Sequence, residues 1–274
     1  MDTLNCKNCG HSFSGKFCNN CGEKVYTEKD KSVRHLFGEA LHFVTHFEGN
    51  FFNTLKSIFT KPGQLSVDYC NGIRKKYFKP LSFFLLLVII YLLFPVFEGL
   101  NMKLRFHETH GLYGKYAKAE VQRIMAERHI TEQQLADIFH HAGERISKFL
   151  MFILIPIIAV ASRLFAYKKR RPYYDHFILS IELLSFFLLW GFMLVPILFT
   201  LLYWIFGIRI ASEEITSIFI FSVFLFYISL AARRFFKVSW GFAIFYAIIF
   251  SISLIILLEY IYKPILFYIA IRMV

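Results

Sequence analysis

The chain has 274 residues, of which 57% are hydrophobic, including 34 Phe and 15 Tyr. This composition excludes an ordinary soluble domain, in which about 45–50% of residues are apolar, and it is typical of a polytopic membrane protein. The net charge is +12, but the Lys and Arg residues cluster beside apolar segments, which argues against a nucleic-acid partner.

Four of the five cysteines lie in the first 21 residues, where Cys6, Cys9, Cys18 and Cys21 form the pattern C-x2-C-x8-C-x2-C. A glycine follows each pair and accommodates the tight turn of a metal-binding knuckle. Four thiolates make a closed tetrahedral site, so we expect residues 1–25 to fold as a small zinc ribbon around a structural Zn²⁺. This use of cysteine indicates a reducing compartment. The ribbon either binds a partner or only orders the N-terminus.

Residues 33–60 predict an amphipathic helix. At about 100° per residue its Phe, Leu and Ile side chains share one broad face, which fits the plane of a membrane interface or the side of a helix bundle. The other face carries His35, His42 and His46. His42 and His46 stand at i, i+4, the spacing of a shared metal or of a pH sensor, although a solvated polar face is the commoner arrangement.

A basic juxtamembrane elbow over residues 61–80 precedes the first long apolar stretch. The elbow side chains that we expect at the lipid headgroups are Arg74, Lys75, Lys76, Tyr77 and Lys79. Lys and Arg beside an apolar stretch stay on the cytoplasmic side of a membrane, and Tyr anchors at the interface. Two interpretations are open, a specific site for an anionic lipid headgroup and simple topological anchoring, and we favour the second.

The N-terminal part of the chain also carries a family resemblance. It rests on the double knuckle, the aromatic-rich helix, Lys61-Pro62-Gly63, and Tyr69 followed by Gly72-x-Arg74-x-x-Tyr77-x-x-Pro80. These features resemble bacterial inner-membrane proteins grouped as domain of unknown function family 3667. The resemblance implies a cytoplasmic zinc ribbon joined to a multi-span domain in the bacterial inner membrane. It implies no known activity and no catalytic residue.

The rest of the chain alternates between apolar and polar stretches. A transmembrane helix needs about 20 apolar residues, and we expect the first at 81–97, an extracytoplasmic helical segment at 98–148, transmembrane helices 2–5 over 149–262, and a short apolar tail at 263–274 on the outer surface. Pro196 predicts a bend in the third transmembrane helix. Basic clusters after alternate stretches place the N-terminus in the cytoplasm and the C-terminus outside.

In the extracytoplasmic segment we predict a helix over residues 120–128. A second helix begins after Thr131, because Gln134 stands three residues later at the spacing of a capping box. Its apolar stripe suggests that this helix runs on into the second transmembrane helix.

Three charged residues lie at membrane depth: Arg163, Glu182 and Glu259. Such a charge costs at least about 2–3 kcal/mol unless it is paired or hydrated, so it is a pointer to function. Arg163 and Glu182 flank the same cytoplasmic loop, and we expect them to form an ion pair with a mainly structural role. Glu259 and Lys263 stand at i, i+4 and should pair as well.

The sequence therefore predicts an all-α polytopic membrane protein with about five transmembrane helices, a four-cysteine zinc ribbon and an amphipathic interfacial helix. It lacks a nucleophile elbow, a P-loop and H-E-x-x-H, so we expect no enzyme activity.

We expect a scaffold, sensor or recruitment protein that contacts anionic lipid headgroups and a cytoplasmic protein partner. The alternative is a transporter or channel for a lipid or small anion, with the ribbon as a regulatory cap. A continuous polar cavity through Glu182 would favour transport, whereas a packed Phe/Leu core would favour the scaffold.

Overall fold

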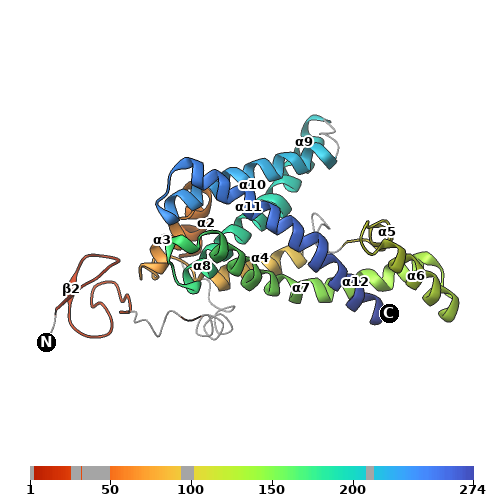
Figure 1. Ribbon diagram of the computed structural model, residues 1–274. Coiled ribbons are helices and arrows are strands. Elements are labelled where there is room, and N and C mark those ends of the chain that lie inside the picture. The colour runs from red at the N-terminus through yellow and green to blue at the C-terminus, as the bar shows by residue number, and fades with distance from the viewer. Residues whose placement is uncertain (1–2, 26–31, 33–49, 94–101, 208–212) are drawn as a thin grey trace.

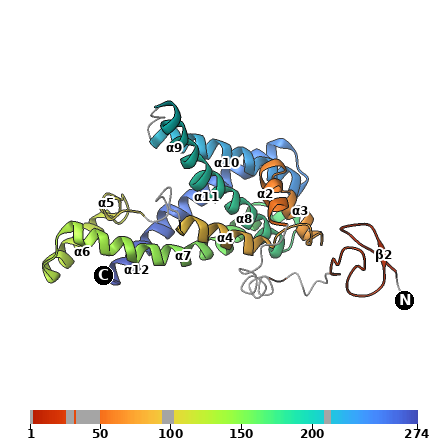
Figure 2. The same cartoon turned by 180° about the vertical axis from the view of Figure 1, so that it is seen from behind.

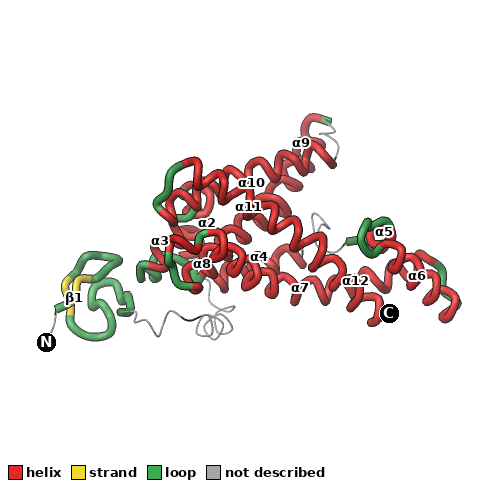
Figure 3. Tube along the Cα trace, in the orientation of Figure 1, coloured by secondary structure: helices red, strands yellow, loops and turns green. Residues whose placement is uncertain are grey.

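The computed structural model describes the chain except residues 1–2, 26–31, 33–49, 94–101 and 208–212. Most of the described residues are helical, and the paired strands lie in the N-terminal ribbon (Figure 3). In chain order the elements are β1 (Leu4–Asn5), β2 (Ser12–Phe13), α2 (Asn50–Thr60), α3 (Gln64–Cys70), α4 (Pro80–Leu93), α5 (Leu104–Glu108), α6 (Gly114–Arg128), α7 (Glu132–Phe165), the 3₁₀ turn η2 (Tyr167–Lys169), α8 (Tyr173–Phe187), the π-helix η3 (Leu188–Leu194), α9 (Val195–Phe206), α10 (Glu213–Phe236), α11 (Trp240–Leu257), the π-helix η4 (Leu258–Tyr262) and α12 (Lys263–Arg272).

Three helical stretches among the described residues are long and apolar enough to cross a membrane: Tyr173–Phe206, Thr216–Phe236 and Trp240–Arg272. Glu132–Ser147 and Phe152–Phe165, bent by 52°, make a fourth if they count as one span. α4 is a shorter apolar helix, and the end of the predicted first transmembrane helix lies outside the described residues. The all-α polytopic fold is confirmed, with three or four span-length helices where about five were expected.

α8 is the central helix of the bundle. Every residue from Tyr174 to Phe186 is buried, and α8 packs against α3, α4 and α7. Apolar residues lie on all sides of α8, which favours burial all round, and its buried polar side chains His176 and Glu182 have hydrogen-bond partners on neighbouring elements. The ribbon and the C-terminal end of α12 lie at opposite ends of the molecule in Figure 1 and in the reverse view of Figure 2.

Large apolar side chains are exposed on the arm formed by α9 and the start of α10, which extends away from the other helices (Figure 1). Trp204 is 82% exposed, and Phe206 is 64% exposed. A soluble monomer rarely exposes a continuous apolar surface of this kind, whereas lipid tails cover it without cost. The exposed apolar side chains of the arm are therefore those expected of a helix pair embedded in a membrane.

Two span-length helices pass through a π-helical turn just before a proline. η3 ends at Leu194, two residues before Pro196, and η4 ends at Tyr262, two residues before Pro264. Proline has no N–H, and its ring clashes with the carbonyl four residues earlier. The wider π turn accommodates the ring, so the irregularity predicted at Pro196 takes the form of a π-helix within one span-length helix.

The predicted short tail at residues 263–274 is largely helical. Residues 263–272 form α12, which continues α11 through η4 and packs against α7. Leu266 and Phe267 of α12 are buried. Because these side chains are buried and α12 packs against α7, residues 263–272 are part of the helical bundle.

The start of α7 agrees with the sequence prediction. The Gln134 amide N–H donates to Thr131 Oγ1 at 3.3 Å, and the Thr131 N–H donates to Gln134 Oε1 at 2.9 Å. This reciprocal capping box satisfies two N–H groups that the first turn of a helix leaves free. α7 then runs on into the second span, as the apolar stripe suggested.

α5 is pinned to the end of the bundle by one buried side chain. His107 has no exposed surface, and its ring centroid lies 5.3 Å from those of Phe139 in α7 and Phe267 in α12. His107 Nδ1 lies 2.6 Å from the Tyr113 hydroxyl. Burial, together with the nearby Lys263 and His110, lowers the pKa of His107 to about 4.

We expect the docking of α5 and α6 to weaken as the pH falls from about 6.5 to about 4. In this window the unfolded state binds a proton at His107 that the folded state excludes, so up to about 3 kcal/mol of stability is lost. Hydrogen exchange in α6, corrected for intrinsic rates, should rise at low pH in the wild type and in the exposed-site control His141→Ala. The same pH dependence in His107→Phe would refute the assignment.

Candidate metal centre

The four N-terminal cysteines converge on one point. One Sγ atom from each of Cys6, Cys9, Cys18 and Cys21 lies within 4.8 Å of the other three. The Sγ atoms of Cys6 and Cys21 are 3.5 Å apart, and those of Cys9 and Cys18 are 3.7 Å apart. Four sulfur ligands at these separations match the tetrahedral shell of a structural metal site. The four residues can therefore hold a metal ion, as predicted.

The two knuckles are built in the same way. The Gly10 N–H donates to the Cys6 carbonyl at 2.9 Å, and the Gly22 N–H donates to the Cys18 carbonyl at 2.7 Å. Both glycines have positive φ, 77° and 68°, a conformation that a residue with a Cβ rarely adopts. The glycine after each C-x-x-C pair thus has the role that the sequence assigned to it.

The ribbon has very little packing of its own. β1 and β2 pair Leu4 with Phe13, and the buried apolar cluster consists of Phe13 with Cys6 and Cys18. The His11 backbone N–H, the largest influence on Cys9, lowers the pKa of that thiol to about 6. The thiolate is the form that binds a metal, so Cys9 is suited to act as a ligand.

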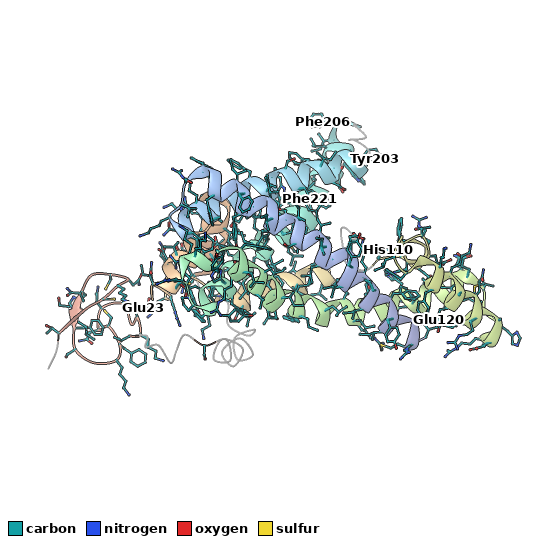
Figure 4. All side chains as sticks on the ribbon, viewed as in Figure 1. Glu23, His110, Glu120, Tyr203, Phe206 and Phe221 are labelled. Carbon is teal, nitrogen blue, oxygen red and sulfur yellow. The ribbon has the colours of Figure 1, made fainter. Side chains whose placement is uncertain are left out.

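Glu23 attaches the ribbon to the elbow of the membrane domain (Figure 4). Its side chain is only 5% exposed. Glu23 Oε2 accepts hydrogen bonds from the backbone N–H groups of Arg74 at 3.1 Å and of Lys75 at 2.8 Å. A carboxylate that accepts two N–H groups makes charge-assisted hydrogen bonds, which are stronger than neutral ones. The metal centre is thereby tied to residues 74–75.

Two lysines cross the same interface. A Cβ added to Gly22 would lie 2.4 Å from Lys75 Nζ, and one added to Gly72 would lie 3.5 Å from Lys7 Cδ. Each lysine therefore covers a glycine on the opposite side of the interface. Beside them the ribbon and the elbow enclose a cleft of about 270 Å³.

The elbow side chains do not all face the headgroups. Arg74 is 5% exposed and lies over the rings of Tyr69 (4.8 Å) and Tyr174 (5.6 Å). Tyr77 is 4% exposed and donates to Asp68 Oδ2 at 2.6 Å. For these two residues the predicted headgroup contact is wrong, because an aromatic pocket and a buried carboxylate take up their polar groups.

The three elbow lysines lie nearer the surface. Lys75 is exposed, Lys79 is partly exposed, and Lys76 pairs with Asp68 at 3.2 Å. Their contact with lipid headgroups stays a prediction.

Glu182 does not pair with Arg163, which is exposed. Instead its buried carboxylate accepts hydrogen bonds at the start of α3: from the Gly63 N–H at 2.7 Å, the Ser66 N–H at 2.8 Å and the Ser66 hydroxyl at 2.5 Å. The Tyr227 hydroxyl of α10 donates to it at 3.3 Å. The predicted ion pair is wrong, because the N–H groups at the start of a helix attract a carboxylate as a cation would.

The Lys61-Pro62-Gly63 turn lies directly against α10. Gly63 has φ 78°, and a Cβ there would lie 2.7 Å from the Ala231 carbonyl oxygen. Arg234 donates a hydrogen bond to the Pro62 carbonyl. Only glycine fits this combination of backbone conformation and close approach. The turn therefore fixes the position of α3 on the bundle.

The third charge at membrane depth is paired as predicted. Lys263 Nζ contacts Glu259 Oε1, and His110 Nε2 lies 3.2 Å from Glu259 Oε2. Glu259 therefore helps to hold the loop after α5 on the last helix. The predicted histidine face of His35, His42 and His46 lies outside the described residues.

The described interior of the bundle contains a small cavity of about 20 Å³. Its lining is apolar and comes from α4, α7, α8, η3, α11 and η4. A polar cluster lies elsewhere in the interior, where Ser162 Oγ is 2.9 Å from His176 Nδ1 and 2.6 Å from the Tyr246 hydroxyl. All three side chains are buried, so this cluster ties α7, α8 and α11 together.

Sequence reasoning missed Glu23, Ser66 and Tyr227 as partners of these sites. Glu23 lies two residues after Cys21, and an acidic residue so close to a metal knuckle was the one available signal. Ser66 and Tyr227 stand 116 and 45 residues from Glu182. At these separations no local spacing relates the residues.

Comparison with known proteins identifies the N-terminal part of the membrane domain. Residues 48–92 match the family model described as "Protein of unknown function (DUF3667)". No curated protein matches the chain, and no solved structure matches it. The matched segment includes α2, α3 and α4, and with them the glycine turn, Ser66 and the Arg74 pocket. The predicted resemblance is confirmed over residues 48–92.

Proposed function

We propose that this chain is a non-catalytic protein of the bacterial inner membrane that uses a cytoplasmic zinc ribbon as a sensing or recruitment module. The observation that carries the proposal is the pair of hydrogen bonds from Arg74 and Lys75 to Glu23. They join the four-cysteine centre to the membrane domain at the family segment. A ribbon that served only as an end cap would not need this buried carboxylate.

Zinc is the metal that this donor set favours. Four thiolates in a tetrahedral arrangement select Zn²⁺ or an iron–sulfur centre, and a single ion with two C-x-x-C knuckles is the usual structural zinc site. A closed shell leaves no position for a substrate or a reactive water. The centre is therefore suited to holding a fold together, and a partner would be recognised by the ribbon surface.

The distribution of basic residues supports a cytoplasmic N-terminus. Arg171 of the loop before α8 donates to the Phe235 carbonyl at the end of α10 at 2.8 Å. Arg234 at the same end donates to Pro62 of the elbow. These contacts bring basic residues of the loop before α8 and of the end of α10 next to the basic elbow, at the end of the bundle where the ribbon docks. Clusters of Lys and Arg mark the cytoplasmic side, and the exposed elbow lysines would face anionic headgroups there.

The alternative function, transport of a lipid or small anion, has less support. A transporter needs polar groups that a substrate can reach near the midplane. Glu182 already accepts hydrogen bonds from Gly63, Ser66 and Tyr227, and the bundle cavity described above is small and apolar. These features favour a packed scaffold.

A photo-reactive residue at Phe17 of the full-length protein tests recruitment in cells. Phe17 is 57% exposed on the ribbon, so a bound partner should form an adduct with it. We expect a reproducible adduct with one cytoplasmic protein, lost when Cys9 and Cys21 are both changed to serine. Adducts with lipid alone, or an adduct unchanged by loss of the cysteines, would overturn the proposal.

A further inference from the structure

The ribbon side of the interface with the elbow depends on the metal, because the metal-binding knuckles fold it. Glu23 follows Cys21 by two residues, and the Cys18 N–H donates to the Glu23 carbonyl at 2.9 Å. The second knuckle therefore places the Glu23 side chain. The apolar cluster of the ribbon consists of Phe13 with its cysteines, and units of this size unfold when their metal is removed.

The other side of the interface is held independently of the ribbon. Asp68 accepts hydrogen bonds from Gln64, Lys76 and Tyr77 at 2.6–3.2 Å. Glu182 holds the start of α3, and the Arg74 guanidinium lies between two tyrosine rings. These contacts do not involve the ribbon, so we expect the elbow to keep its shape when the ribbon leaves.

The charge of the centre also favours docking of an occupied ribbon. Four thiolates outnumber the positive charges of Zn²⁺, so an occupied centre is anionic. Lys75 Nζ lies against Gly22, the glycine that closes the second knuckle. The negative charge of an occupied centre attracts this ammonium group.

We propose that occupancy of the four-cysteine centre controls whether the ribbon is docked on the elbow, so that loss of the metal releases the ribbon and uncovers the backbone amides of Arg74 and Lys75. This inference rests on the proposed function and adds the signal to which the module responds, a thiolate-binding metal ion. Release also frees Lys75 for an anionic partner such as a lipid headgroup.

Hydrogen exchange on the full-length protein in lipid nanodiscs, with one equivalent of Zn²⁺ or with a chelator, tests the coupling. We expect chelation to speed exchange in residues 3–25 and, by about tenfold or more, at Arg74 and Lys75, because their N–H groups lose the Glu23 carboxylate. Exchange at Ser66, whose acceptor is Glu182, should stay unchanged. Unchanged exchange at residues 74–75 after the ribbon has opened would overturn the proposal.

Glu23→Ala separates docking from metal binding. All four cysteines remain, so the variant should bind zinc stoichiometrically, yet with zinc bound its Arg74 and Lys75 amides should exchange as fast as in the chelated wild type. The matched control is Lys16→Ala, an exposed ribbon residue, which should behave as wild type. Slow exchange at residues 74–75 in Glu23→Ala would contradict the role of the carboxylate.

The two proposals can fail separately. Metal-dependent exchange at Arg74 and Lys75 without any Phe17 adduct would retain the docking switch and reject recruitment. If the Phe17 adduct depends on the metal but hydrogen exchange at residues 74–75 does not, recruitment is retained and the docking switch is rejected.

Discussion

Changing Cys18 and Cys21 to serine will abolish metal binding and unfold the ribbon while the helical bundle stays folded. Structural zinc contributes about 10–16 kcal/mol of apparent binding free energy to units of this kind at neutral pH. The buried apolar cluster of the ribbon, built on Phe13, offers little to replace it. Elemental analysis of the purified protein should find one zinc per chain in the wild type and none in the double variant.

Cys70→Ser is the matched control for cysteine loss. Cys70 is buried in α3 and is not one of the four cysteines whose Sγ atoms converge, so this variant should keep the full zinc content. Helix content measured by circular dichroism should be close to wild type in both variants, because the ribbon contains no described helix. Retention of zinc by the Cys18/Cys21 double variant would refute the four-thiolate centre.

Replacing Glu182 by alanine is expected to lower the free energy of unfolding of the bundle by about 3–5 kcal/mol. The carboxylate is buried, and its removal leaves the donors of Gly63, Ser66 and Tyr227 without this acceptor. Each buried donor left unsatisfied costs about 1–3 kcal/mol. Denaturant or thermal unfolding of the protein in detergent measures the loss.

Two controls make the Glu182 experiment specific. Glu127→Ala removes a carboxylate whose side chain is 60% exposed, and it should change stability by less than about 0.5 kcal/mol. Arg163→Ala should also be nearly neutral, because Arg163 is exposed and Glu182 has other partners. If Arg163→Ala were as harmful as Glu182→Ala, and charge reversal at both positions restored stability, the helix-capping role would be rejected.

Glu127→Ala and Glu182→Ala remove carboxylates from different surroundings. A surface carboxylate is solvated in both the folded and the unfolded state, so its removal changes little. A buried carboxylate that accepts hydrogen bonds from helix N–H groups is no longer solvated by water. When it is removed, these buried donors lose their acceptor, which costs stability. The expected difference between Glu127 and Glu182 follows from this contrast.

Features that depend on neighbours within a few residues were predictable. The C-x-x-C-G knuckles place two thiolates by local backbone geometry, and the capping box at Thr131 and the pair Glu259–Lys263 lie within one helical turn. The length of the apolar stretches likewise predicted membrane helices, because hydropathy and rise per residue are local properties. At Pro196 the sequence located the irregularity, but only the structure specified a π-helix.

Features that depend on how the helices pack against one another were not predictable. Arg163 and Glu182 looked like partners because they flank one loop, yet Glu182 meets Gly63 and Ser66, more than 100 residues earlier in the chain. Arg74 and Tyr77 looked like headgroup contacts because they belong to a basic cluster, yet both are buried. A basic or aromatic residue at a membrane surface can face lipid or protein, and the sequence pattern is the same in both cases.

The amino-acid sequence alone determined the class of this protein, its four-cysteine centre and its family segment, because spacing and hydropathy act over short distances. Only the tertiary structure decided that Glu23 ties this centre to the elbow, that Glu182 caps α3, and that the last residues complete the bundle. The physical reason is that the helices present nearly uniform Phe and Leu surfaces. Such surfaces specify burial, but the shapes of the packed side chains and a few buried polar groups select the partner.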